Sequence, residues 1–294
     1  MIKNTMISER EVAKLFTSNC LNAIACNDLL TLEKIKLFEI ANYFEVKSFD
    51  ELYNNAYHIL SKNYRNEYIY KNIIARKIFL GRHSFSTSNL LSEFRVGSNI
   101  ADLVLLNGHS TCYEIKTEYD SLLRLDNQLS SFLKVFDKVN VVCSFSMLEN
   151  ILHLAPPQVG VIVLTDQNTL RTIRQPVITE ELDISLIMKS LRKEEYKSIA
   201  EKFYGLKIEV PNTRLYDLCE KIIKQQDPKL VKKALLSTLK SARKNHSFAI
   251  NSLPYSLTNA LISFKFRQND LQNLIKIFSS RERNVLPNIE REVK

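Results

Sequence analysis

The sequence predicts an α/β (α+β) protein, in which a mixed sheet flanked by helices lies between N-terminal and C-terminal all-helical parts. Apolar runs of strand length fall in the middle of the chain, at residues 100–106, 110–116 and 138–145. Helix-start signals dominate the first sixty residues, and helical spacing of apolar residues dominates beyond about residue 179. We expect three domains: a helical prefix at residues 1–60, a core at 61–178 and a helical domain at 179–294.

Two capping boxes mark helix starts in the prefix. Segments 8–11 and 48–51 each place a serine three residues before a glutamate, so that the two side chains satisfy backbone N–H groups of the first turn. Residues 65–77 follow with apolar positions at helical spacing. We therefore expect helices after Ser8 and Ser48, and another over residues 65–77.

The expected core continues beyond its first strands as a helix, a strand and a hairpin. Residues 121–136 predict a helix whose apolar face carries Leu122, Leu125, Leu129 and Phe132. A strand is expected at 138–145. Strands at 160–165 and 169–174, joined by a polar turn, would extend the sheet.

The C-terminal part shows helical spacing throughout. Asp227 and Pro228 form a favourable start for one of its helices, because proline at the first turn loses no hydrogen bond. The expected helices cover residues 183–191, 192–204, 214–224, 228–244 and, as one long or broken helix, 255–280.

Composition limits the class of protein. The formal net charge of +9 favours a polyanionic partner, and nucleic acid is the partner that we expect. No apolar segment approaches the length of a membrane span and no signal peptide is recognisable, so we expect a cytoplasmic protein without a membrane partner. Five cysteines without C-x-x-C spacing indicate reduced thiols rather than a disulfide framework or a zinc site.

Three charged residues interrupt the two central apolar runs. Asp102 heads the first run, while Glu114 and Lys116 lie in the second. Burying charge is costly unless the charges are paired or bind a metal, so these residues indicate a site. Since side chains alternate along a strand, Glu114 and Lys116 share one face with Cys112.

The register of the hairpin decides whether Asp102 joins them. A two-residue turn at Asn107 and Gly108 would pair Asp102 with Tyr113 and leave the carboxylates on opposite faces. A three-residue loop that includes His109 pairs Asp102 with Glu114 instead. We predict the three-residue loop, with Gly108 or a neighbour at positive φ.

Asp102 followed by Glu114-Ile115-Lys116 resembles the signature of the PD-(D/E)XK nuclease superfamily, although Ala101 replaces the usual proline. The longer string Tyr-Glu-Ile-Lys at 113–116, followed by Asp-x-Leu-x-Arg-Leu-x-x-Gln at 120–128, is similar to a poorly characterised bacterial and prophage branch. The resemblance covers about residues 64–174. It implies a restriction-endonuclease-like mixed sheet and a metal-dependent phosphodiesterase, which we expect to be a nuclease that acts on DNA in phage defence or mobile-element DNA metabolism.

The resemblance also implies further site residues. Gln128 with Phe132 is similar to a Gln-x-x-x-Tyr helix motif, with phenylalanine in place of tyrosine, which makes Gln128 a candidate catalytic residue. One more glutamate is expected upstream, and Glu67 and Glu93 both qualify.

Carboxylate oxygens suit Mg²⁺ or Mn²⁺. Asp102, Glu114, the Ile115 carbonyl and one of the two upstream glutamates would hold the ion, which would activate a water. Lys116 would orient that water and offset developing negative charge.

Basic side chains supply candidate nucleic-acid contacts, which can equally be ordinary solvated charges. One lies next to the expected site and the others on the helix that begins at Pro228; they are Arg124, Lys229, Lys232, Lys233, Lys240 and Arg243.

Other interpretations stay open. The charged cluster can be a purely structural ion pair. The chain can also be a catalytically silent DNA-binding or partner-binding regulatory protein on a nuclease fold. DNA is favoured over RNA as the nucleic acid, and a partner protein or a homo-oligomer is possible.

Overall fold

The computed structural model describes residues 7–245, 247–279 and 286. They divide into two compact units. Residues 77–245 form the first, which we call the sheet unit. The described residues of 1–76 and 246–294 form the second, the helical unit. This division differs from the expected boundaries after residues 60 and 178.

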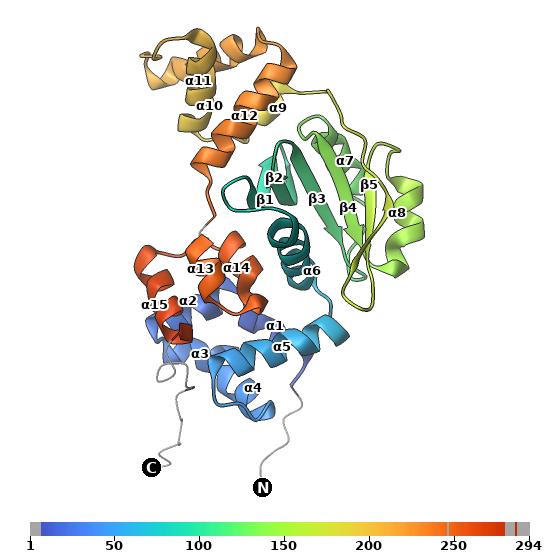
Figure 1. The fold of residues 1–294 in the computed structure, drawn as a ribbon, viewed down its shortest axis with the longest axis vertical. Helices are drawn as coiled ribbons and strands as arrows, with labels where there is room; N and C mark the ends of the chain where they lie inside the picture. The colour runs from blue at the N-terminus through green and yellow to red at the C-terminus, as the bar shows by residue number, and fades with distance from the viewer. Residues whose placement is uncertain (1–6, 246, 280–285, 287–294) are drawn as a thin grey trace. The chain divides into compact units, whose positions relative to one another are not determined.

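The sheet unit is built on a mixed six-stranded sheet (Figure 1). The strands follow chain order in the sheet, with β1/β2, β2/β3 and β5/β6 antiparallel and β3/β4 and β4/β5 parallel. Their bounds are β1 Asn89–Val96, β2 Asn99–Leu106, β3 Ser110–Lys116, β4 Lys138–Cys143, β5 Gly160–Leu164 and β6 Leu170–Arg174. The mixed sheet flanked by helices confirms the predicted fold class.

Two helices connect the parallel strands. Helix α7 (Leu125–Leu133) buries Leu125, Leu129 and Phe132, as its apolar spacing predicts. It begins four residues later than expected, because Asp120 accepts hydrogen bonds from the backbone N–H and hydroxyl of Thr117 and holds a turn there. Helix α8 (Leu148–Leu154) follows β4 after a short 3-10 turn η3 (Phe145–Met147) and was not predicted.

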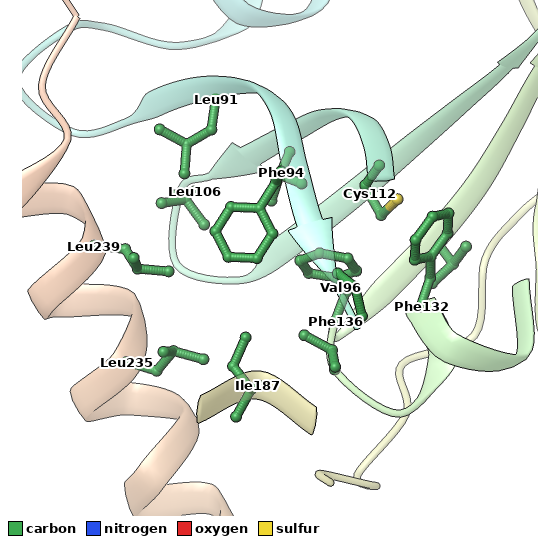
Figure 2. Close-up of a cluster of buried hydrophobic side chains, with 14 of the residues drawn as sticks. Leu91, Phe94, Val96, Leu106, Cys112, Phe132, Phe136, Ile187, Leu235 and Leu239 are labelled. Carbon is green, nitrogen blue, oxygen red and sulfur yellow. The ribbon is translucent and has the colours of Figure 1, made fainter. Parts of the chain in front are cut away.

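Four further helices complete the sheet unit: α9 (Ile184–Met188), α10 (Lys193–Tyr204), α11 (Asn212–Lys224) and α12 (Pro228–Ala242). Figure 2 shows Leu235 and Leu239 of α12 and Ile187 of α9 lying against Phe94 and Phe136 in one apolar cluster. Burial in a shared core stabilises the helices and the sheet together. This is why residues 184–242 belong with the sheet rather than to a separate C-terminal domain.

The helical unit joins the two ends of the chain. Tyr68 donates a hydrogen bond to the Ser256 carbonyl (2.7 Å), and the side-chain amide of Asn72 contacts Tyr255 and Asn259. Its helices are α1 (Glu9–Ala13), α2 (Ser18–Cys26), α3 (Leu29–Ile35), α4 (Leu37–Tyr43), α5 (Phe49–Asn63), α6 (Glu67–Ile74), α13 (Ser247–Ser252), α14 (Thr258–Ser263) and α15 (Gln268–Ser279), with 3-10 turns η1 (Lys14–Phe16) and η4 (Tyr255–Leu257).

Local signals located the helix starts correctly. Ser8 and Glu11 form the predicted capping box, and the Ser48 hydroxyl accepts a hydrogen bond from the Glu51 N–H. Helix α6 continues into a π-helical turn, η2 (Ala75–Leu80). The expected helix at 255–280 is broken into η4, α14 and α15, and its last residue lies outside the described residues. Among the described helices, none combines the length and apolar character that crossing a membrane requires.

Candidate functional site

The β2–β3 hairpin has the predicted three-residue loop. Leu106 pairs with Ser110, which leaves residues 107–109 in the loop, and Gly108 has a φ of 111°. The ladder runs to the pair Leu103 and Tyr113. The ladder ends at this pair, so the three-residue loop is confirmed and the placement of Asp102 opposite Glu114 stays a prediction.

Asp102 is tied to the neighbouring strand by its side chain. Its Oδ2 accepts a hydrogen bond from the Ile115 N–H at 2.7 Å, just beyond the end of the backbone ladder. The carboxylate therefore takes the place of a backbone acceptor at this point of the sheet. A charge-assisted bond of this kind is among the stronger hydrogen bonds in proteins.

Glu114, Lys116 and Gln128 form a connected group on the α7 face of β3. The Lys116 ammonium donates to Glu114 Oε1 at 2.9 Å and to Gln128 Oε1 at 3.0 Å. Glu114 is 2% exposed and Lys116 is 8% exposed, so the ion pair is buried. Gln128 lies in the first turn of α7, between the buried residues Leu125 and Leu129, and its side chain reaches Lys116.

Cys112 lies on the same strand face as this group. Burial raises the pKa of its thiol well above the ordinary value, and the negative charges of Glu114 and Asp102 raise the pKa further. The thiol is therefore protonated at neutral pH.

Glu67 and Glu93 fall in different units. Glu67 begins α6 in the helical unit and forms an ion pair with Lys71 at 2.6 Å. Glu93 is exposed on β1 with a φ of 53°, and lies between the pairs Ser92–Leu103 and Phe94–Ala101. Glu93 is thus the glutamate that the sheet itself places across from Asp102.

Carboxylate oxygens of Asp102 and Glu93 lie within 4.8 Å of each other, a donor type that suits a hard cation, and Glu114 does not belong to this group among the described residues. One oxygen each of Asp102 and Glu114 already accepts a hydrogen bond from the protein. Binding of Mg²⁺ or Mn²⁺, and the part of the Ile115 carbonyl in it, stay predictions.

Most of the expected basic face on α12 is engaged within the protein. Lys232 contacts Asp137 at 3.1 Å and the Thr179 carbonyl at 2.7 Å, and Lys240 donates to the Thr87 carbonyl. Lys229 pairs with Glu180 at 2.9 Å on the surface. These contacts fasten α12 rather than leave its cations for a ligand.

Arg243 is held most firmly. Two of its guanidinium nitrogens donate to the Glu195 carboxylate at 2.7 Å each, and the guanidinium lies 5.0 Å from the Phe94 ring centroid. Arg124 and Lys233 are exposed, and neither forms an ion pair with a described residue.

Asp137 is an organising residue that the sequence did not reveal. Its Oδ2 accepts hydrogen bonds from the N–H and hydroxyl of Ser110, while its Oδ1 pairs with Lys232. It joins the start of β3 to α12. No local pattern marks it, because all of its partners are distant in the chain.

Comparison with known proteins gives a family. A model of the family described as "Bacteriophage P4 protein cII" matches residues 61–275. Protein cII of Enterobacteria phage P4 is 30% identical over 126 residues, which are 41% of this chain and 47% of the phage protein. The chain thus spans about half the length of the curated relative that it matches. A solved structure, a protein of unknown function from Silicibacter pomeroyi, is 17% identical with a TM-score of 0.31, and the match covers 40% of this chain and 79% of that chain.

These matches contradict the expectation that the chain functions as a metal-dependent nuclease, with a hydrolase activity in phage defence. They fit the alternative of a regulatory protein. The physical reason for the error is that carboxylates and a lysine in buried strands are the same residue types in a metal site and in a structural ion pair. Here Lys116 is occupied by Glu114 and Gln128.

Proposed function

The chain belongs to the bacteriophage P4 protein cII family, and from this premise we propose that it is a phage-type regulatory protein that acts by binding DNA. The observation that carries the proposal is the extent of the family match. It covers residues 61–275 and so includes the whole sheet unit.

Charge supports a nucleic-acid partner. The formal net charge is +9, which favours association with polyanions. Arg124 at the start of α7 and Lys233 on α12 are the exposed cations of the predicted set without an ion pair among the described residues. We assign phosphate contacts to these two side chains.

The geometry around Lys116 supports binding without catalysis. The ammonium donates to two protein acceptors in a buried setting, so its charge is satisfied inside the fold. Both members of the ion pair lie on β3, and the hydrogen bond from Lys116 to Gln128 joins β3 to α7. We assign Glu114, Lys116 and Gln128 this structural role.

The test is a binding titration of the full chain. Labelled double-stranded DNA, single-stranded DNA and RNA of one sequence are titrated in EDTA at several salt concentrations, with fluorescence anisotropy as the signal. We expect metal-independent binding that prefers double-stranded DNA and weakens with salt. Arg124→Gln and Lys233→Gln should each lower the salt slope by about one.

Lys193→Gln is the matched control, because Lys193 is exposed on α10 of the same unit and forms no ion pair among the described residues. Its titration should match that of the wild type. Absence of DNA binding at low salt, preference for RNA, or a requirement for a divalent ion would each reject the proposal.

A further inference from the structure

A pocket of about 480 Å³ lies on the sheet face opposite the apolar cluster. Its floor consists of strand residues that alternate with those of the cluster: Leu105, Thr111, Tyr113, Asn140 and Ile162. The strand register makes the floor continuous, since Leu105 pairs with Thr111 and Tyr113 pairs with Asn140. The volume is in the range of small-molecule sites.

Basic side chains surround this floor. Lys77 comes from η2, Arg82 and His83 from the segment after it, His109 from the β2–β3 loop and Lys138 from β4. All of them belong to the sheet unit. Three permanent positive charges and two imidazoles therefore converge on one concavity.

These charges have no partner of opposite sign in the pocket. None of its seventeen described lining residues is acidic. Lys77, Arg82 and Lys138 form no ion pair with any carboxylate in the described part of the chain, and His109 Nδ1 is 4.0 Å from Asp137. Lys229 and Lys232 of α12, and Arg243 directly after it, differ because each has a carboxylate partner.

The floor adds neutral polar groups in fixed positions. Burial raises the pKa of Tyr113 to about 12, against the opposing effect of the nearby Arg82 charge, so the phenol is a hydrogen-bond donor at neutral pH. Asn140 is 3% exposed, and a Cβ on Gly160 would collide with its side chain and with Pro176. Glycine at position 160 therefore keeps Asn140 in its place on the floor.

We propose that this pocket binds a small phosphate-bearing ligand of about mononucleotide size, whose phosphates contact Lys77, Arg82 and Lys138. Converging cations repel one another, and an anion relieves this repulsion. Arginine and lysine are the side chains that proteins use to bind phosphate. The inference adds a small-molecule site to a DNA-binding regulator and holds whether or not DNA is its target.

The shape of the site favours a small ligand over a nucleic-acid backbone. The cations surround a floor that includes Leu105 and Ile162, so an apolar ring could rest on the floor while phosphates reach the rim. A free nucleotide and a nucleic-acid strand share the phosphate chemistry. The experiment below separates these two sources.

The test is isothermal titration calorimetry on the full chain with ATP, with pyrophosphate and with sulfate at matched ionic strength. We expect saturable binding of ATP and pyrophosphate with one site per chain, and no comparable binding of sulfate. The double variant Arg82→Gln/Lys138→Gln should raise the Kd for ATP by at least about tenfold. Arg82→Lys, which keeps the charge, should retain more affinity than Arg82→Gln.

Arg214→Gln/Lys221→Gln is the charge-matched control, because both residues are exposed on α11 of the same unit. It should bind ATP as the wild type does, and the melting temperatures of all unliganded variants should agree. Equal weakening by the control double variant, or no saturable binding of either phosphate compound, would overturn the proposal. Loss of DNA binding by Arg82→Gln/Lys138→Gln without any binding of ATP or pyrophosphate would also overturn it and would assign this face to DNA.

Discussion

The two faces of the sheet handle charge in opposite ways. On the α7 face, Glu114 and Lys116 are buried and paired, and Gln128 accepts a second hydrogen bond from the lysine. On the other face, Arg82 and Lys138 surround a pocket without a carboxylate among its described lining residues. Glu114, Lys116 and Gln128, which the sequence indicated as site residues, therefore have protein partners. The pocket cations that have no carboxylate partner among the described residues lie on the other face, which no sequence motif marked.

The difference separates the type of a charged residue from the availability of its charge to a ligand. A charge that is paired inside the fold contributes to the arrangement of helices and strands, and removing its partner leaves a costly buried ion. A charge that is exposed and unpaired contributes little to stability and is ready for a ligand. The following variants test this separation, from the largest expected effect to the smallest.

Glu114→Ala should have the largest effect. It leaves the Lys116 ammonium buried without its carboxylate, which should lower the free energy of unfolding by about 3–5 kcal/mol. Urea denaturation followed by circular dichroism measures the loss. Glu118→Ala, at an exposed position two residues after Lys116, serves as the control. A loss no greater than that of the control would show that the pair on the α7 face is not structural.

Glu195→Gln tests the ion pair that fastens Arg243. Burial by itself would raise the pKa of Glu195, but hydrogen bonds from Arg243 and from the Arg192 N–H hold it below the ordinary value of 4.5. A lowered carboxylate pKa contributes stability that is present above the unfolded pKa and is lost as the pH falls through the folded pKa. We expect the variant to be about 1–3 kcal/mol less stable at neutral pH. The difference from the wild type should shrink on acidification below about pH 4.5.

The measurement is a series of urea denaturations of wild type and Glu195→Gln between about pH 7 and pH 3. A difference that stays constant over this range would mean that the Glu195 carboxylate is not the titrating group behind the effect.

Lys232→Ala and Lys233→Ala compare neighbouring cations on one helix. Lys232 is engaged with Asp137 and Thr179, so its loss should cost about 1–2 kcal/mol. Lys233 is exposed, and its loss should change stability by less than about 0.5 kcal/mol. Thermal unfolding of the two variants side by side gives the comparison, and equal losses would contradict the assignment of Lys232 to fastening α12.

Arg82→Gln should have the smallest effect on the unliganded protein. Because it removes one of several like charges without a partner, the free energy of unfolding should stay within about 0.5 kcal/mol of wild type or rise slightly. Urea denaturation in buffer free of phosphate and sulfate measures it. A loss above about 1 kcal/mol would show that Arg82 has a structural role. It would contradict the statement that the cations on the pocket face contribute little to stability.

Features that depend on neighbours in the chain were predictable from the sequence. The length of the hairpin loop fixes the register, so residues 107–109 were sufficient to predict the pairing from Leu106 with Ser110 to Leu103 with Tyr113. Ser8 and Ser48 act on backbone N–H groups within one helical turn, and both caps are observed.

Features that depend on distant partners were not predictable. The acceptors of Lys240 and Arg243, the Thr87 carbonyl and Glu195, are far from them in sequence, so a basic helix face gave no sign that it was engaged. The two units likewise arise from long-range contacts such as Tyr68 with Ser256. The pocket was missed for the same reason, since its cations come from separate elements.

The chain order of the strands has a consequence for how the protein is made. Every strand of the sheet pairs with the strand that precedes or follows it in the sequence, so sheet growth requires few long loop closures and can proceed during synthesis. Leu235 and Leu239 of α12, which complete the apolar cluster, leave the ribosome after all six strands. While α9 to α12 are being translated, the sheet can therefore be assembled with part of its apolar face uncovered. During this interval we expect the nascent chain to depend most on chaperones.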